Sequence, residues 1–135
     1  MTVERVAAHS AAMPFNRWVG IAVVSADESE VVLRLPYRED LCQNAGGLHA
    51  GVILGLLENA CGFAAGLHIG PGVVTHFDSQ FLRPAHGEAF VAVGRVLKAG
   101  RRQAFSEADA YIEVDGARGP LFATARATLV PTGTD

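Results

Sequence analysis

The sequence predicts an α+β domain in which an antiparallel sheet of five to six strands wraps around one long central helix. Two observations support this prediction. An almost uncharged apolar run extends from Ala50 to Leu67, which is longer than an ordinary strand. Two strand-like segments precede this run and four follow it. A doubly wound parallel sheet does not fit, because it would need a helix between successive strands.

The residues before the central run predict a short helix and a hairpin. A helix within residues 2–18 is expected to end before Pro14, since the residue before a proline disfavours helical geometry. Residues 18–26 and 30–37 are expected to be strands, joined by a turn at 27–29. In the second strand Val31, Leu33 and Leu35 share one face.

The central run is expected to be surrounded by protein, because a helix that is apolar on every side must be buried. Strands are expected at residues 73–84, 88–99, 101–114 and 120–130, separated by turns. Small residues alternate in the last two strands, for example Ala104, Ala108 and Ala125. Small side chains at alternate positions let a sheet pack closely against a bulky element, and the central helix is the element available. A single domain is expected over residues 1–135, with a core of about 15–130.

Composition excludes several classes of protein. The chain has 135 residues, of which 50% are hydrophobic and 19% charged, as expected of a globular domain. The net charge of −3 gives no indication of a nucleic-acid partner. The N-terminus lacks a signal-peptide pattern, and Glu58 and Asn59 interrupt the apolar run, which argues against a membrane span. With two cysteines and no disulfide framework, a cytoplasmic location is expected.

Glu58 is the one charged residue of the apolar run, and burying a charge is costly unless it is paired or neutralised. It could be structural, pairing with an arginine or reaching the surface at a subunit contact. A functional interpretation is favoured by the glycine-rich segment "NAGGLHAG", which leads into the helix, follows Gln43 and contains His49. The first N–H groups of a helix lack internal partners and suit the oxyanion of an acyl transfer.

Basic residues gather between positions 83 and 102, with five Lys or Arg against one acid. Arg83, Arg101 and Arg102 lie at strand ends or turns, where they could bind phosphates. Arg95 and Lys98 are expected to be solvated strand residues. Ala50 and Glu58 are eight residues apart, or roughly 12 Å along one helix. This is too far for both to act on one carbonyl, so a shared site requires two subunits.

These residues together resemble the hotdog-fold acyl-CoA thioesterases of the phenylacetate-pathway and 4-hydroxybenzoyl-CoA thioesterase type. The resemblance covers about residues 15 to 130 and rests on four segments: "QNAGGLHAG", "LLENACG", "VVTHFDSQFLRPA" and "VLKAGRR". It implies hydrolysis of an acyl-CoA thioester to a carboxylic acid and CoA, without a metal or other cofactor. It also implies a homodimer at least, and a homotetramer built as a dimer of dimers.

The resemblance assigns roles residue by residue. Glu58 is the nucleophile or general base, and the N–H of Ala50, which follows the loop histidine His49, polarises the thioester carbonyl. Gln43 helps to hold the carbonyl or the water. The expected substrate contacts are Gly51, Asn59, Arg83, Arg101 and Arg102, with the arginines toward the CoA phosphates. For Asn59, a contact at the dimer seam is the alternative.

Two positions depart from the family pattern, and two other functions stay open. Ala50 stands where the family usually has Gly, and Gly62 stands where members often carry Thr or Ser. One alternative is a non-catalytic acyl-CoA-binding hotdog module. The other is a hotdog hydratase or dehydratase that uses His76 and Asp78, a pair without an evident third ligand for a metal.

Overall fold

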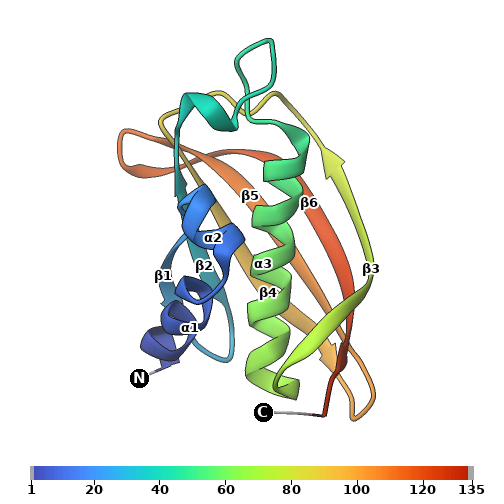
Figure 1. Cartoon of the computed structure of the whole chain (residues 1–135). Helices are drawn as coiled ribbons and strands as arrows, with labels where there is room; N and C mark the ends of the chain where they lie inside the picture. The colour runs from blue at the N-terminus through green and yellow to red at the C-terminus, as the bar shows by residue number, and fades with distance from the viewer. Residues whose placement is uncertain (1, 134–135) are drawn as a thin grey trace.

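In the computed structural model, which describes residues 2–133, one antiparallel sheet curls around a long helix (Figure 1). The helices are α1 (Thr2–Ala11), α2 (Pro14–Val19) and α3 (Ala50–Ile69), with a 3-10 turn at Glu39–Leu41. The strands are β1 (Ala22–Ala26), β2 (Val31–Pro36), β3 (Gly72–Phe81), β4 (Ala89–Ala99), β5 (Ala104–Val114) and β6 (Ala117–Pro131). This is the hotdog fold, as predicted.

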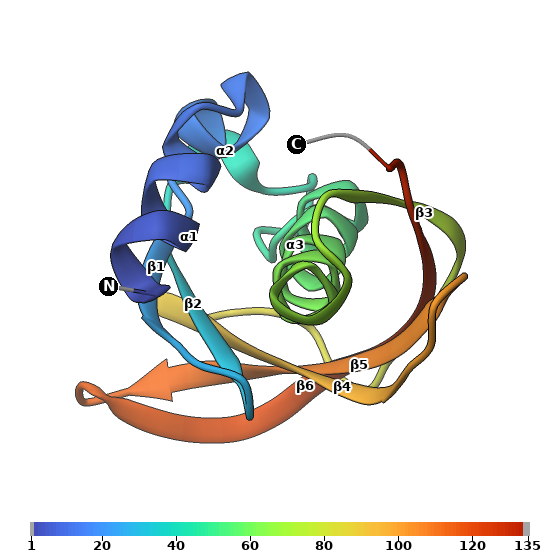
Figure 2. The same cartoon turned by 90° about the horizontal axis from the view of Figure 1, so that it is seen from below.

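The six strands are arranged in the order β1-β2-β4-β5-β6-β3. Strand β3 follows α3 in the chain but pairs with the last strand, so β1 and β3 form the two edges of the sheet. Seen from below, the sheet curves beneath α3, with β3 on one side and α1 and α2 on the other (Figure 2).

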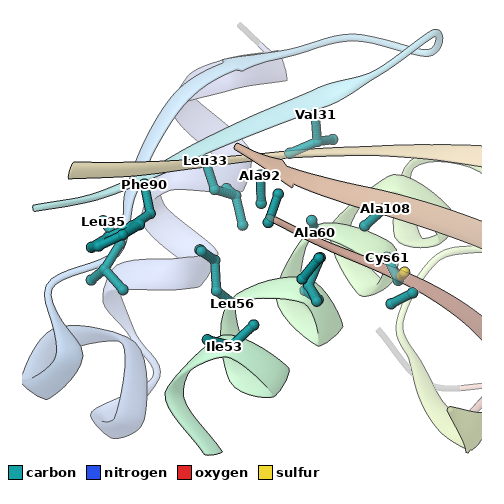
Figure 3. Packing of buried hydrophobic residues seen from close by; sticks show 14 of the residues in the cluster. Val31, Leu33, Leu35, Ile53, Leu56, Ala60, Cys61, Phe90, Ala92 and Ala108 are labelled. Carbon is teal, nitrogen blue, oxygen red and sulfur yellow. The ribbon is translucent and has the colours of Figure 1, made fainter. Parts of the chain in front are cut away.

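Packing between α3 and the sheet is close because the facing residues are small. Gly94 of β4 lies directly against α3, and a Cβ atom there would overlap the carbonyl group of Ala60. Apolar side chains fill the rest of this interface (Figure 3), among them Leu33, Leu35, Ile53, Leu56, Phe90 and Ala92. The alternating small residues of β5 and β6, such as Ala108 and Ala125, are buried as expected.

The N-terminal segment differs from its prediction. Helix α1 ends before Pro14, as expected, but Pro14 then begins α2 at its first turn, where the missing proline N–H costs nothing. The strand expected over residues 18–26 is therefore wrong in its first part: Trp18 lies in α2, and β1 begins only at Ala22. By length and composition α3 could cross a membrane, yet 56% of that stretch is buried inside the fold.

Candidate active site

The turn that leads into α3 is closed by its own backbone. The Gln43 N–H donates to the Gly47 carbonyl at 2.9 Å, and the Gly46 N–H donates to the Gln43 carbonyl at 3.0 Å. Gly46 has a φ of 97°, a left-handed conformation that glycine adopts without steric cost. The turn delivers His49 to the N-cap position of α3.

Three of the first four N–H groups of α3 already have acceptors. His49 Nδ1 accepts a hydrogen bond from the Gly51 N–H at 2.8 Å, and the His49 carbonyl accepts from Val52 and Ile53 at 3.0 and 3.2 Å. The remaining N–H, that of the exposed Ala50, has no acceptor among residues 2–133. The helix therefore offers one free donor, which suits a single carbonyl oxygen.

The hydrogen bond to Nδ1 defines the tautomer of a neutral His49 ring, because this nitrogen must be an acceptor. The proton of the neutral ring must then be on Nε2, which leaves Nε2–H as a donor. The same bond occupies the N–H of Gly51, so this N–H is not available for the predicted substrate contact. Sequence alone could not decide which N–H of this turn stays free.

Gln43 is exposed at the start of the same turn. Its Oε1 accepts a hydrogen bond from the Ala45 N–H at 2.7 Å. Within the described part of the chain, its side-chain NH₂ group has no acceptor. In this arrangement Gln43 stiffens the turn through its oxygen and keeps its NH₂ group available to a ligand.

Glu58 is half-buried in the middle of α3, and burial raises the pKa of its carboxyl group above the ordinary 4.5. No described residue hydrogen-bonds or ion-pairs with this carboxylate, so residues 2–133 supply no partner arginine for it. Its Oε2 lies 3.7 Å from the place where a Cβ on Gly62 would stand, and Leu129 Cδ2 is 3.8 Å from that place. The carboxylate thus points along α3 toward its C-terminal end.

The free N–H and the carboxylate are far apart within one chain. Ala50 and Glu58 are separated by eight residues of continuous α3, or about 12 Å, and the carboxylate leans further away, toward Gly62. Two hollows of about 300 and 370 Å³ lie elsewhere, one between α1, α2 and β1 and one on the outer face of the sheet. Neither is lined by Gln43, His49, Ala50 or Glu58.

Asn59 lies in the interior and is bonded to the protein itself. Its Nδ2 donates to the Gly55 carbonyl at 2.7 Å, and its Oδ1 accepts from Asn16 Nδ2 of α2 at 2.8 Å. Asn16 Nδ2 also donates to Ser10 Oγ of α1 at 2.9 Å. The structure therefore places Asn59 where it ties α1 and α2 to α3, and its amide groups are not presented to a substrate.

Cys61 is the other chemically reactive group of this part of α3. Its side chain is fully buried, and Ser106 Oγ donates to its carbonyl at 3.1 Å. Burial raises the pKa of the Cys61 thiol to about 12. A thiol that stays protonated is a poor nucleophile, so Cys61 is not a candidate for the reacting group.

The three predicted phosphate-binding arginines do not converge within one chain. Arg83 follows β3, at the end of the sheet where β4 begins, whereas Arg101 and Arg102 lie in the turn after β4. Strand β4 has 11 residues, so these two places are separated by about 35 Å. All three side chains are exposed, while Arg95 pairs with Glu107 and Asp109.

His86 lies beside the glycine turn and was not anticipated from the sequence. Its ring is 3.5 Å from the place of a Cβ on Gly47 and 3.8 Å from that on Gly46. The neighbouring Ala85 carbonyl accepts a hydrogen bond from the Leu48 N–H at 3.1 Å. The segment before β4 thus supports the turn, a long-range contact that no local spacing in the sequence reveals.

His76 and Asp78 form a pair on the edge strand β3. Their side chains are 3.3 Å apart and mostly exposed. Among the described residues, no third His, Cys, Asp or Glu completes a metal-ligand group with them. The pair lies at the sheet edge rather than on α3, so its role in a hydratase stays a prediction.

Residues 2–133 combine an antiparallel sheet around a central helix with a free N–H at the start of that helix and a half-buried carboxylate without a partner. The architecture is that of a hotdog protein. The family model described as the thioesterase superfamily matches residues 45–117. Human acyl-coenzyme A thioesterase 13 is 31% identical over 129 residues, covering 93% of this chain and 90% of that protein. The chain belongs to the thioesterase superfamily.

Solved structures agree with this assignment. A thioesterase family protein from Silicibacter pomeroyi has a TM-score of 0.88 and 33% identity, covering 96% of this chain and 97% of that one. The PaaI protein of the phenylacetic acid degradation operon of E. coli has a TM-score of 0.86 at 17% identity, covering 98% and 97% of the two chains. At that identity the second likeness supports the fold alone.

Proposed function

We propose that this protein hydrolyses an acyl-CoA thioester to a carboxylic acid and CoA. Membership of the thioesterase superfamily supports thioester hydrolysis, and the name of the human relative supports an acyl-CoA substrate. The observation that carries the proposal is the pair of unsatisfied groups on α3. The Ala50 N–H has no acceptor and the Glu58 carboxylate has no partner within residues 2–133.

In the proposed reaction the Ala50 N–H binds the thioester carbonyl oxygen and stabilises the negative charge that forms on it. Glu58 acts by one of two routes. As a general base, it takes a proton from water while the water oxygen attacks the carbonyl carbon. As a nucleophile, its oxygen attacks directly to give an anhydride, which water then hydrolyses. In both routes the C–S bond breaks and the CoA thiolate leaves.

The active site in this proposal is built from two subunits. A two-fold dimer with antiparallel α3 helices brings Ala50 of one chain beside Glu58 of the other. For that pairing the two-fold axis passes midway between the two positions, at Leu54, which is half-exposed. Strand β3 supports such an assembly, since it is an edge strand that exposes Val73 and Phe81, and unpaired edges are usually covered.

The proposal also includes CoA binding by three arginines and assembly into a homotetramer. Arg83 lies at the end of the molecule where α3 begins, and Arg101 and Arg102 lie at the opposite end of β4. In an antiparallel dimer these ends come from different chains, which would gather the three arginines around one CoA. Pairing of two dimers gives the homotetramer. A cytoplasmic location is supported by two unpaired cysteines.

Two substitutions test this proposal. Glu58→Gln should lower turnover by about 10³-fold while an acyl-CoA still binds. Ala50→Pro removes the free N–H but suits the first turn of a helix, because His49 already has the extended ψ of 141° that a following proline requires. It should lower turnover by about 10²-fold, whereas Ala50→Gly keeps the N–H and activity.

The measurement is release of the CoA thiol across a panel of short-chain, medium-chain and aromatic acyl-CoAs. Full activity of Glu58→Gln would contradict the proposed role of the carboxylate. Tight binding of acyl-CoA by the natural protein without thiol release would instead favour the non-catalytic binding module.

A further inference from the structure

Phe15 of α2 packs against α3 at Gly55, about one turn before Glu58. Its ring lies directly over Gly55, where an added Cβ would stand 2.7 and 2.8 Å from two ring atoms. Gly55 and Glu58 are three residues apart and therefore share one face of the helix. Only a glycine at position 55 lets an aromatic ring rest on the helix backbone this close to the carboxylate.

A second contact fixes the ring in this place. Asn16, the residue after Phe15, is buried and donates to Asn59 Oδ1 at 2.8 Å, and Asn59 is held in turn by the Gly55 carbonyl. The α2 helix is thus attached to α3 at Gly55 and at Asn59, on both sides of Glu58 in the sequence. This attachment orients Phe15 more firmly than a hydrophobic contact on the surface would.

In the single chain the ring is open on its outer side. Phe15 is 43% exposed although it touches α3, and Trp18 lies at 6.3 Å between ring centroids and is also exposed. An uncharged aromatic surface beside the reacting carboxylate suits the apolar part of the substrate. The phosphates of CoA would instead be drawn to the exposed arginines at the ends of β4.

We infer that Phe15 is a specificity-determining residue that limits the length of the acyl group. This inference rests on the proposed function. Gly55 is about one turn, or roughly 4.5 Å along the axis, from Glu58, so the ring closes the space next to the carboxylate within a few methylene groups. The natural protein is then expected to favour compact acyl groups, such as short-chain or aromatic ones, over long straight chains.

The test compares Phe15→Ala with Phe105→Ala, using butyryl-CoA and dodecanoyl-CoA. Phe105 is a matched control, since it is 37% exposed but lies on the outer face of the sheet. Phe15→Ala should raise the ratio of kcat/KM for dodecanoyl-CoA over butyryl-CoA about tenfold. Phe105→Ala should leave this ratio unchanged. Gly55→Ala displaces the ring and should move the ratio in the same direction as Phe15→Ala.

A second readout separates this inference from the catalytic proposal. In the Glu58→Gln background, calorimetry gives the Kd ratio for the same two acyl-CoAs without turnover, and adding Phe15→Ala should shift it about tenfold toward the longer chain. A ratio that stays within twofold in both assays would overturn the inference. So would a Phe15→Ala protein whose only change is its oligomeric mass, because Phe15 would then be a partner contact. Neither result bears on Glu58.

Discussion

The two sides of α3 differ in how far residues of the same chain cover them and satisfy their polar groups. On the side facing the sheet, Leu56 and Ala60 are fully buried, and Gly94 lets β4 touch the helix backbone. On the other side Glu58 and Gly62 are half-exposed, and no described residue partners the carboxylate. The same helix thus supplies stability on one face and leaves an unsatisfied charge on the other. This difference is what the proposed function explains, by placing a substrate and a second subunit against the second face.

The largest effect on the sheet-facing side is expected from Gly94→Ala. The new methyl group would overlap the Ala60 carbonyl, which is backbone and cannot rotate away, so the free energy of unfolding should fall by about 3 kcal/mol. Urea denaturation measures it. Gly66→Ala is the matched control, since a Cβ there meets no atom within 4 Å, and it should stabilise the helix by about 1 kcal/mol. Equal stability of the two variants would contradict the close packing.

The face of α3 that points away from the sheet, here called the open face, begins near His49. His49→Ala removes the acceptor of the Gly51 N–H. The loss of this N-cap bond should lower the free energy of unfolding by about 1 kcal/mol. Activity should fall as well, because the Ala50 N–H is no longer oriented. His49→Asn restores a capping oxygen and should recover the stability. If His49→Ala unfolds at the same denaturant concentration as the natural protein, the His49 cap does not contribute to the free energy of unfolding.

In the middle of the open face, Glu58→Gln should separate stability from function. Burial raises the Glu58 pKa, so the folded state prefers the neutral acid. The stabilising contribution is therefore complete below the unfolded value near 4.5 and is lost as pH rises through the raised folded pKa. Glu58→Gln has no carboxyl group to ionise, so its free energy of unfolding at neutral pH should exceed that of the natural protein by about 1 kcal/mol. The difference should vanish near pH 4.

The activity of the natural protein should have the opposite pH dependence. Only the carboxylate form of Glu58 can act as base or nucleophile, so kcat/KM should rise with pH through a midpoint above 4.5. Thermal melts and pH–rate profiles of the same preparation measure both trends. A midpoint at or below 4.5 would mean that Glu58 is not the group that titrates.

The smallest effect is expected from Gly62→Ser. A Cβ at this position would stand 3.7 Å from Glu58 Oε2, an ordinary contact, and the hydroxyl could donate to the carboxylate. A hydrogen bond to the charged form lowers a pKa, so the acid side of the pH–rate profile should move to lower pH. Gly62→Ala, which adds the Cβ without the hydroxyl, should leave the profile in place.

The sequence predicted those features that depend on local pattern. The apolar run gave α3 from its first residue, and the alternating small residues of β5 and β6 indicated close packing with the helix. Helix α2 was missed because Pro14 both follows one helix and begins the next. The inward turn of Asn59 toward Asn16 and the support of the glycine turn by His86 join segments far apart in the chain. Local spacing carries no information on such contacts.

The central claim is that one active site uses Ala50 of one subunit and Glu58 of the other. Co-expression of Ala50→Pro and Glu58→Gln chains with different affinity tags, followed by isolation of the mixed dimer, tests it directly. Each parent dimer should turn over at least about 10²-fold more slowly than the natural protein. The mixed dimer contains one intact site of two and should recover about half of the natural activity per dimer. A mixed dimer as inactive as its parents would contradict the shared site.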